Sequence, residues 1–129
     1  MSSRLINQIK DETMSLIEKI EGSKHAPVVV LFGGSPYRRD EVVRLISKLG
    51  DVTVYGTLGE EEGIAKIEEL NRKVDVVLIG GRYSAEQRKR IKSWVNENIP
   101  DAKISQPGVE YPYSNETILA DIRQKFETK

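Results

Sequence analysis

Two similar stretches decide the fold of this chain: residues 28–34 (VVVLFGG) and residues 75–81 (DVVLIGG). Each is a short apolar run, rich in β-branched residues, that ends in paired glycines. This pattern is typical of a strand that is buried on both faces and followed by a tight turn. Two further runs, residues 51–57 (DVTVYGT) and 101–107 (DAKISQP), alternate apolar with polar residues, which predicts strands at the edges of a sheet.

Apolar residues at helical spacing follow each of these four strands. They form four stripes: Val42, Val43, Ile46 and Leu49; Ile64, Ile67, Leu70 and Val74; Ile91, Trp94, Val95 and Ile99; and Ile118, Leu119, Ile122 and Phe126. Ser84 with Gln87, and Thr57 with Glu60, have the spacing of a capping box, and Ser114 is placed to cap the last helix. The chain is therefore predicted to alternate strands with helices.

The sequence predicts one α/β domain over residues 1–129, with an N-terminal helix at 1–22, a connector at 23–27 and four strand–helix units at 28–129. The two fully apolar strands belong in the centre of the sheet, since both of their faces must be covered. Right-handed crossovers then give a four-stranded parallel sheet of order 2-1-3-4. This is a three-layer, doubly wound architecture of the flavodoxin-like or Rossmann-like type.

An internal repeat accompanies this alternation. Residues 29–34 align without a gap to residues 76–81. Duplication of a half that contains two strands and two helices is one interpretation. Convergence of both segments on a buried strand with a tight turn is the other. Both interpretations place the two Gly-Gly turns side by side.

Composition narrows the classes of function. The 129 residues include no cysteine, which excludes disulfides, thiolate metal sites and cysteine nucleophiles. The 20 basic and 20 acidic residues cancel, which argues against a general binder of nucleic acid or of anionic membranes. No apolar stretch has the length of a membrane span, and residues 1–10 do not resemble a signal peptide. We expect a cytoplasmic protein.

Two segments leave alternatives open. The N-terminal helix carries Ile6, Ile9, Leu16 and Ile20 at heptad spacing, so it either covers its own sheet or pairs with a second copy in a homodimer. The loop at 106–114 is long for a strand–helix connection and contains Tyr111 and Tyr113. It is either a lid or recognition surface for a partner, or a plug for the end of a small core.

In this architecture, ligands bind beyond the carboxyl ends of the strands, where the strand order reverses. That point lies between the first and third strands. Paired glycines there let backbone N–H groups approach a ligand, and the neighbouring arginines, tyrosines and serines offer charge and hydrogen bonds. The predicted ligand-binding residues are Gly33, Gly34, Ser35, Tyr37, Arg38, Arg39, Gly80, Gly81, Arg82, Tyr83 and Ser84.

A purely structural interpretation of these loops is also open. Glycines after a buried strand are often only turn residues, and Arg38 and Arg39 are close enough in sequence to pair with Asp40 and Glu41. Neither a GxxxxGK[ST] loop nor a GxGxxG motif is present. An acidic second helix and a basic third helix are expected to form salt bridges with each other, so nucleic acid is not the expected partner of the basic helix.

From about residue 28 onward, the architecture resembles response-regulator receiver domains. A receiver requires acidic residues after its first strand and a phospho-accepting aspartate after its third, whereas this chain has glycine pairs there. Asp75 lies at the wrong end of its strand, and a fifth strand with the receiver lysine is absent. The resemblance therefore implies at most a receiver-like interaction module without a phospho-acceptor. A flavodoxin-type phosphate loop is rich in Ser and Thr, whereas this loop offers only Ser35, so no cofactor is identified.

Catalytic and metal-binding patterns are sparse. The only histidine, His25, lies in the connector, so Ser35 or Ser84 would lack an evident base as a nucleophile, and no metal site is predicted. Enzymatic activity stays open, but binding is favoured. Two hypotheses remain: a binding domain for a small anionic or phosphate-containing ligand at the Gly-Gly edge, and a receiver-like module that binds a protein.

Overall fold

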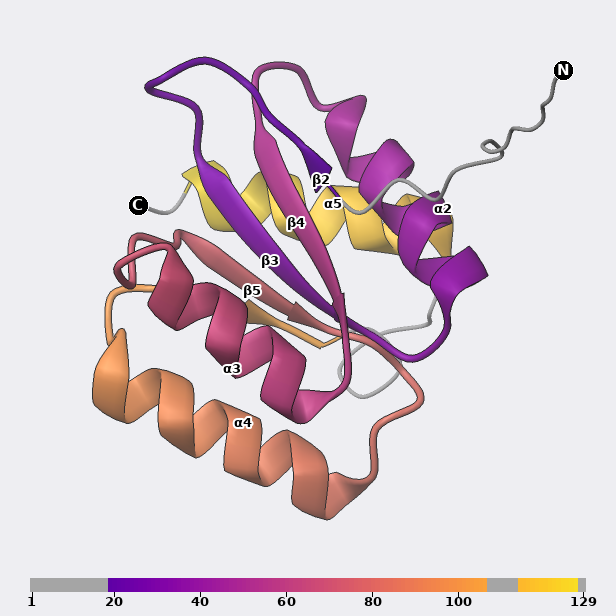
Figure 1. The fold of residues 1–129 in the computed structure, drawn as a ribbon. Coiled ribbons are helices and arrows are strands. Elements are labelled where there is room, and N and C mark those ends of the chain that lie inside the picture. The colour runs from indigo at the N-terminus through magenta and orange to yellow at the C-terminus, as the bar shows by residue number, and fades with distance from the viewer. Residues whose placement is uncertain (1–18, 107–113, 128–129) are drawn as a thin grey trace, which may run out of the picture.

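A computed structural model of the chain describes residues 19–106 and 114–127. These residues form an α/β arrangement of a five-stranded mixed sheet and four helices (Figure 1). In chain order the elements are β2 (Lys19–Ile20), β3 (Val28–Gly33), α2 (Pro36–Ser47), β4 (Thr53–Leu58), α3 (Glu60–Glu69), β5 (Val76–Ile79), α4 (Ala85–Asn98), β6 (Lys103–Ser105) and α5 (Asn115–Glu127).

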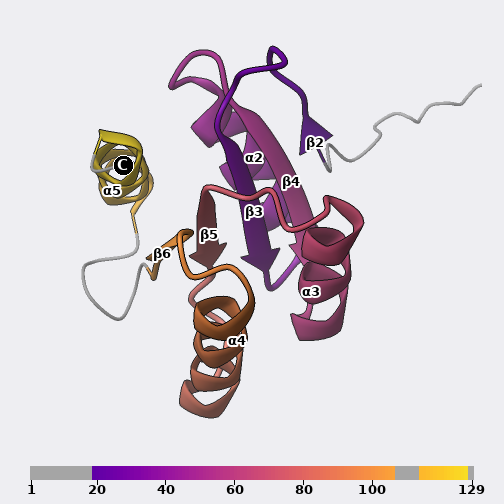
Figure 2. The same cartoon turned by 90° about the vertical axis from the view of Figure 1, so that its left-hand side faces the viewer.

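Four of the strands are parallel and lie in the order β4-β3-β5-β6, which is the predicted 2-1-3-4 order. The prediction of an entirely parallel, four-stranded sheet is wrong, because β2 pairs antiparallel with β4. Figure 2 shows β2 at one edge of the sheet and β6 at the other. An open strand edge carries unpaired backbone groups, and β2 provides partners for part of β4.

Helices cover both faces of the sheet, as the strand order predicts. One core cluster joins α2 and α5 to the sheet, and the other joins α3 and α4 to the opposite face (Figures 1 and 2). Along β3, Val29 and Leu31 face α2 and α5, whereas Val30 and Phe32 face α3 and α4. All four side chains are at most 1% exposed, which explains why this strand is apolar at every position.

The repeated segments pair with each other in the register in which their sequences align. Val29 lies opposite Val76, Leu31 opposite Leu78, and Phe32 opposite Ile79. The two Gly-Gly turns consequently leave the sheet next to each other, at its carboxyl edge. This adjacency is what the predicted ligand site requires.

The end of the predicted N-terminal helix is wrong. Residues 1–18 lie outside the described residues, but Lys19 and Ile20, which fall within the predicted helix at 1–22, form β2. Lys19 pairs with Tyr55 and Ile20 with Val54, and Ile20 also packs against the core beside α2. A strand edge and an apolar cluster outweigh the helical periodicity to which Ile20 belongs.

The caps and strand limits were predicted in part. Ser84 and Gln87 form the expected capping box of α4, and Ser114 Oγ accepts from the Thr117 amide at the start of α5 (3.2 Å). The Thr57–Glu60 capping box is wrong: α3 begins after Gly59, whose φ is +97°, and no side chain caps it. Thr57 instead lies within β4, which begins at Thr53, two residues later than predicted. The fourth predicted strand shortens to β6, which has three residues.

Candidate ligand-binding site

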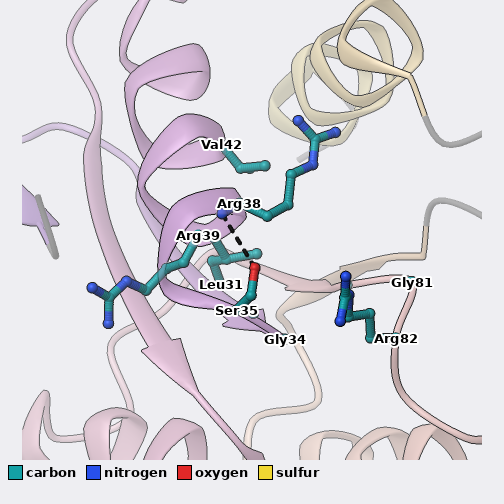
Figure 3. Close-up of a pocket in the computed structure, with 10 residues that line it drawn as sticks. Leu31, Gly34, Ser35, Arg38, Arg39, Val42, Gly81 and Arg82 are labelled. Carbon is teal, nitrogen blue, oxygen red and sulfur yellow. Dashed lines mark hydrogen bonds between the residues drawn. The ribbon is translucent and has the colours of Figure 1, made fainter. Parts of the chain in front are cut away.

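A pocket of about 290 Å³ lies between the two Gly-Gly turns at the carboxyl edge of the sheet. We call it the Gly-Gly pocket; it is lined by Leu31, Gly33, Gly34, Ser35, Arg38, Arg39, Val42, Gly80, Gly81 and Arg82 (Figure 3). Eight of the eleven predicted ligand-binding residues line it, and Tyr37, Tyr83 and Ser84 do not. The topology therefore brings together most of the ligand-binding residues that the sequence predicts.

Two apolar lining residues were missed. Leu31 on β3 and Val42 on α2 are each 1% exposed, and both belong to the core cluster beneath α2 and α5. The sequence pattern identified Leu31 and Val42 as core residues, and nothing in the pattern showed that a pocket would reach them. The pocket therefore has a polar, basic mouth above apolar core side chains, which is usual for small-molecule sites.

Arg82 is the cation that is most available at this pocket. Its side chain is exposed, and among the described residues it has no hydrogen bond or ion pair. A Cβ atom on Gly34 would lie 2.8 Å from both Cβ and Cδ of Arg82. The missing side chain of Gly34 therefore makes the room in which Arg82 lies across the loop.

Arg38 is partly engaged. Its Nη1 donates to Glu41 Oε1 at 2.8 Å and to Asn115 Oδ1 at 3.0 Å, so it joins α2 to the start of α5. The hydrogen bond and charge of Arg38 lower the pKa of the Glu41 carboxyl below its usual value. The structural interpretation of this arginine, pairing with a nearby acid, is thus correct, although Arg38 also lines the pocket.

Arg39 is largely a structural residue. It is 4% exposed, its Nε donates to Asp40 Oδ1 at 3.1 Å, and its buried Nη2 has no hydrogen-bond partner among the described residues. Its Cγ and Cδ lie over Gly56 of β4, where a Cβ atom would be 2.8–3.0 Å away. Figure 3 shows the guanidinium groups of Arg38 and Arg39 pointing in different directions, with that of Arg39 directed away from Arg82. Only the stem of Arg39 is therefore placed to contact a ligand.

The N-terminus of α2 opens onto the same pocket. Ser35 is its N-cap and accepts from the Arg38 amide at 3.3 Å, and the first turn holds no acidic residue. Pro36 has no N–H, and the amides of Arg38 and Arg39 both donate to Ser35. The Tyr37 amide is therefore the first-turn N–H group that has no partner within the described ranges. The partial positive charge of a helix N-terminus favours an anion here, although few amides are free to bind it.

The three remaining predicted residues have other positions. The Tyr37 side chain is 86% exposed and does not line the pocket. Ser84 is used as the cap of α4, where its Oγ accepts from the Gln87 amide. Tyr83 is buried: its hydroxyl donates to the Gly33 carbonyl at 3.0 Å and accepts from the Gly59 amide at 3.1 Å. Burial raises the pKa of its phenol above the usual value.

Other candidate chemistry is structural in the described part of the chain. The Asp75 carboxylate accepts from the Val28 amide at 2.8 Å, so it joins the starts of β5 and β3. Arg90 on α4 donates two hydrogen bonds to Glu60 on α3, one of the salt bridges expected between these helices. Within residues 19–106 and 114–127, no cluster of His, Asp and Glu side chains could hold a metal ion. No helix in these two ranges has both the length and the apolar character to cross a membrane.

Comparison with family models, with curated proteins and with solved structures found no match to this chain. The described lining offers guanidinium groups, one helix N-terminus, glycine backbone and apolar carbon atoms, and no pair of nucleophile and base. Such a lining can bind and orient an anion.

Proposed function

We propose that this domain binds a small anionic or phosphate-containing ligand in the Gly-Gly pocket. The observation that carries the proposal is Arg82, an exposed cation without an ion pair in the described residues, lying across Gly34 at the mouth of a pocket. A guanidinium group presents several N–H donors in one plane, which suits the oxygens of a carboxylate or phosphate.

Three further features support this proposal. The pocket lies where the order of the parallel strands reverses, the usual position of ligands in doubly wound sheets of the flavodoxin-like kind. The N-terminus of α2 and Arg38 add positive potential to that of Arg82. Leu31 and Val42 offer apolar contacts to the rest of the ligand.

Thermal unfolding with simple anions, sugar phosphates, nucleotides and flavins tests the proposal. A compound at about 100 times its dissociation constant adds roughly 2.7 kcal/mol to the stability of the folded chain, a shift of several degrees for a domain of this size. We expect Arg82→Ala to reduce the shift. Arg44→Ala, at an exposed arginine in the last turn of α2 that does not line the pocket, is the control and should leave the shift unchanged.

Two results would contradict the proposal. One is an equal shift in the parent and in Arg82→Ala, which would place binding elsewhere. The other is the absence of a shift with any compound in the panel, which would favour the protein-interaction hypothesis. That hypothesis depends on the N-terminal helix and the loop at 106–114. Most of both segments lies outside the described residues, so it stays a prediction, as does a cytoplasmic location.

A further inference from the structure

A second pocket adjoins the Gly-Gly pocket. We call it the Tyr83 pocket; its volume is about 230 Å³, and it is lined by Gly33, Gly34, Leu58, Gly59, Arg82, Tyr83 and Gln87. It shares Gly33, Gly34 and Arg82 with the Gly-Gly pocket. The two pockets thus lie on either side of one short segment of loop.

Two of the three residues that the pockets share are glycines, which have no side chain to separate the two pockets. At Gly33 a Cβ atom would lie 3.1 Å from the Thr57 carbonyl oxygen and 3.1 Å from Arg39 Cβ, so the backbone is closely packed there. At Gly34 the nearest atoms belong to Arg82. Apart from backbone, the Arg82 side chain is the described group that borders both pockets, and it can contact a ligand that extends from one into the other.

The two pockets share Arg82 but differ in their other charges. Arg38 also borders the Gly-Gly pocket, whereas Gly59 of the Tyr83 pocket directly precedes the acidic first turn of α3, formed by Glu60, Glu61 and Glu62. Arg90 pairs with Glu60, but Glu61 and Glu62 have no ion pair in the described residues. The charges of Glu60 and Glu62 contribute to the raised pKa of Tyr83. A second anionic group is therefore disfavoured in the Tyr83 pocket.

The Tyr83 pocket instead offers neutral contacts. Gln87 Oε1 accepts from the Ser84 amide at 2.9 Å, which leaves its NH₂ group without a partner within the described ranges. Leu58, which is partly exposed, offers apolar surface. At about 290 Å³ the Gly-Gly pocket alone is at the small end of the roughly 300–1,000 Å³ usual for ligand sites, and the two pockets together fall within that range.

We infer that the ligand is a phosphate monoester with an uncharged polar remainder, whose phosphate lies in the Gly-Gly pocket and whose remainder lies in the Tyr83 pocket. This inference rests on the proposed function, because it requires an anion in the Gly-Gly pocket. A nucleoside 5′-monophosphate and a hexose phosphate share this chemistry, and the experiment distinguishes them.

The experiment is isothermal titration of the 129-residue chain with inorganic phosphate, four nucleoside 5′-monophosphates and glucose 6-phosphate. At least one ester should bind tenfold or more tightly than inorganic phosphate. The ester that binds most tightly shows whether the uncharged part of the ligand is a nucleoside or a sugar. Gln87→Glu preserves the capping box, because Glu is a regular partner in that motif, while it removes the amide donor and adds negative charge to the Tyr83 pocket. We expect this variant to weaken the ester about tenfold and inorganic phosphate much less.

Gln124→Glu makes the same chemical change at an exposed position of α5 and should leave both affinities unchanged. If inorganic phosphate binds through Arg82 but no ester binds more tightly, or if Gln87→Glu weakens both equally, the inference is overturned and the proposed function stands. If neither inorganic phosphate nor any ester binds the parent chain, the inference is overturned and the proposed function loses its phosphate ligand.

Discussion

The Tyr83 hydroxyl donates a hydrogen bond to the carbonyl oxygen of Gly33 at 3.0 Å, which links residues 50 positions apart in the chain. The Tyr83 hydroxyl oxygen also accepts a hydrogen bond from the Gly59 amide at 3.1 Å, and the Tyr83 ring packs edge-on against Phe32 with a centroid separation of 6.5 Å. One phenol therefore joins the loop after β5 to the ends of β3 and β4. Tyr83 therefore connects loops that border both pockets.

The first prediction is that Tyr83→Phe destabilises the fold. The substitution keeps the ring but leaves the Gly33 carbonyl and the Gly59 amide without their partner, and an unsatisfied buried polar group costs about 1–3 kcal/mol. Urea denaturation should show a lower midpoint with an unchanged slope. Tyr37→Phe, at an exposed tyrosine, is the control and should have no measurable effect. Equal midpoints for Tyr83→Phe and the parent would show that the phenol does not stabilise these loops.

The second prediction is that the stability of the fold decreases at alkaline pH because of Tyr83. Because burial raises the pKa of Tyr83 in the folded chain, the neutral phenol is favoured there. The stabilisation that the buried, neutral phenol provides is complete below the unfolded pKa of about 10. It is lost as the pH rises through the folded pKa. The free energy of unfolding should therefore fall above about pH 10, and less steeply in Tyr83→Phe. Tyr55, whose pKa burial also raises, should maintain part of the slope in the variant. Parallel curves for the two proteins would contradict this assignment.

A third prediction concerns Gly34 and Arg82. Gly34→Ala places a Cβ atom 2.8 Å from Arg82 Cβ, so the arginine must move from its position at the pocket. We expect Gly34→Ala to lower the affinity for a bound anion nearly as much as Arg82→Ala does. The double variant should be little weaker than either single variant, because both remove the same interaction. Additive losses in a titration of all four proteins would show that the two residues act independently.

The fourth prediction tests the contact between α3 and the sheet. Gly→Ala within a helix normally stabilises, by up to about 1 kcal/mol. A Cβ atom on Gly63 would overlap the fully buried Phe32 ring, and such overpacking costs about 1–3 kcal/mol. Gly63→Ala should therefore lower the melting temperature by several degrees. Phe32→Leu in the same chain should recover part of the loss attributed to Gly63→Ala. A rise in melting temperature for the single variant would show that α3 does not pack this closely.

A fifth prediction separates capping from ligand binding at Ser84. Since Ser84 Oγ accepts from the Gln87 amide, Ser84→Ala should cost about 1 kcal/mol of stability, and Ser84→Asp, which also caps helices well, should cost less. Inorganic phosphate should bind both variants as it binds the parent, because Ser84 does not line the Gly-Gly pocket. A loss of phosphate affinity in both variants would show that Ser84 contributes to ligand binding after all.

The sequence by itself determined the strand–helix alternation, the order of the four parallel strands and most of the Gly-Gly pocket. The periodicity of apolar residues is a local signal, and the uninterrupted apolar runs require that β3 and β5 be central. Once those two strands are neighbours, Gly33, Gly34, Gly80 and Gly81 must follow them at the same edge.

Only the tertiary structure decided the rest, because it depends on contacts between distant residues and on the direction of each side chain. Lys19 and Ile20 form a strand because β4 offers an open edge, which local helical spacing does not reveal. Arg38, Arg39 and Arg82 are chemically alike in the sequence, yet one pairs with Glu41, one is buried beside Asp40, and one is left at the pocket. Burial and the charges nearby separate their roles, and both are properties of the folded chain.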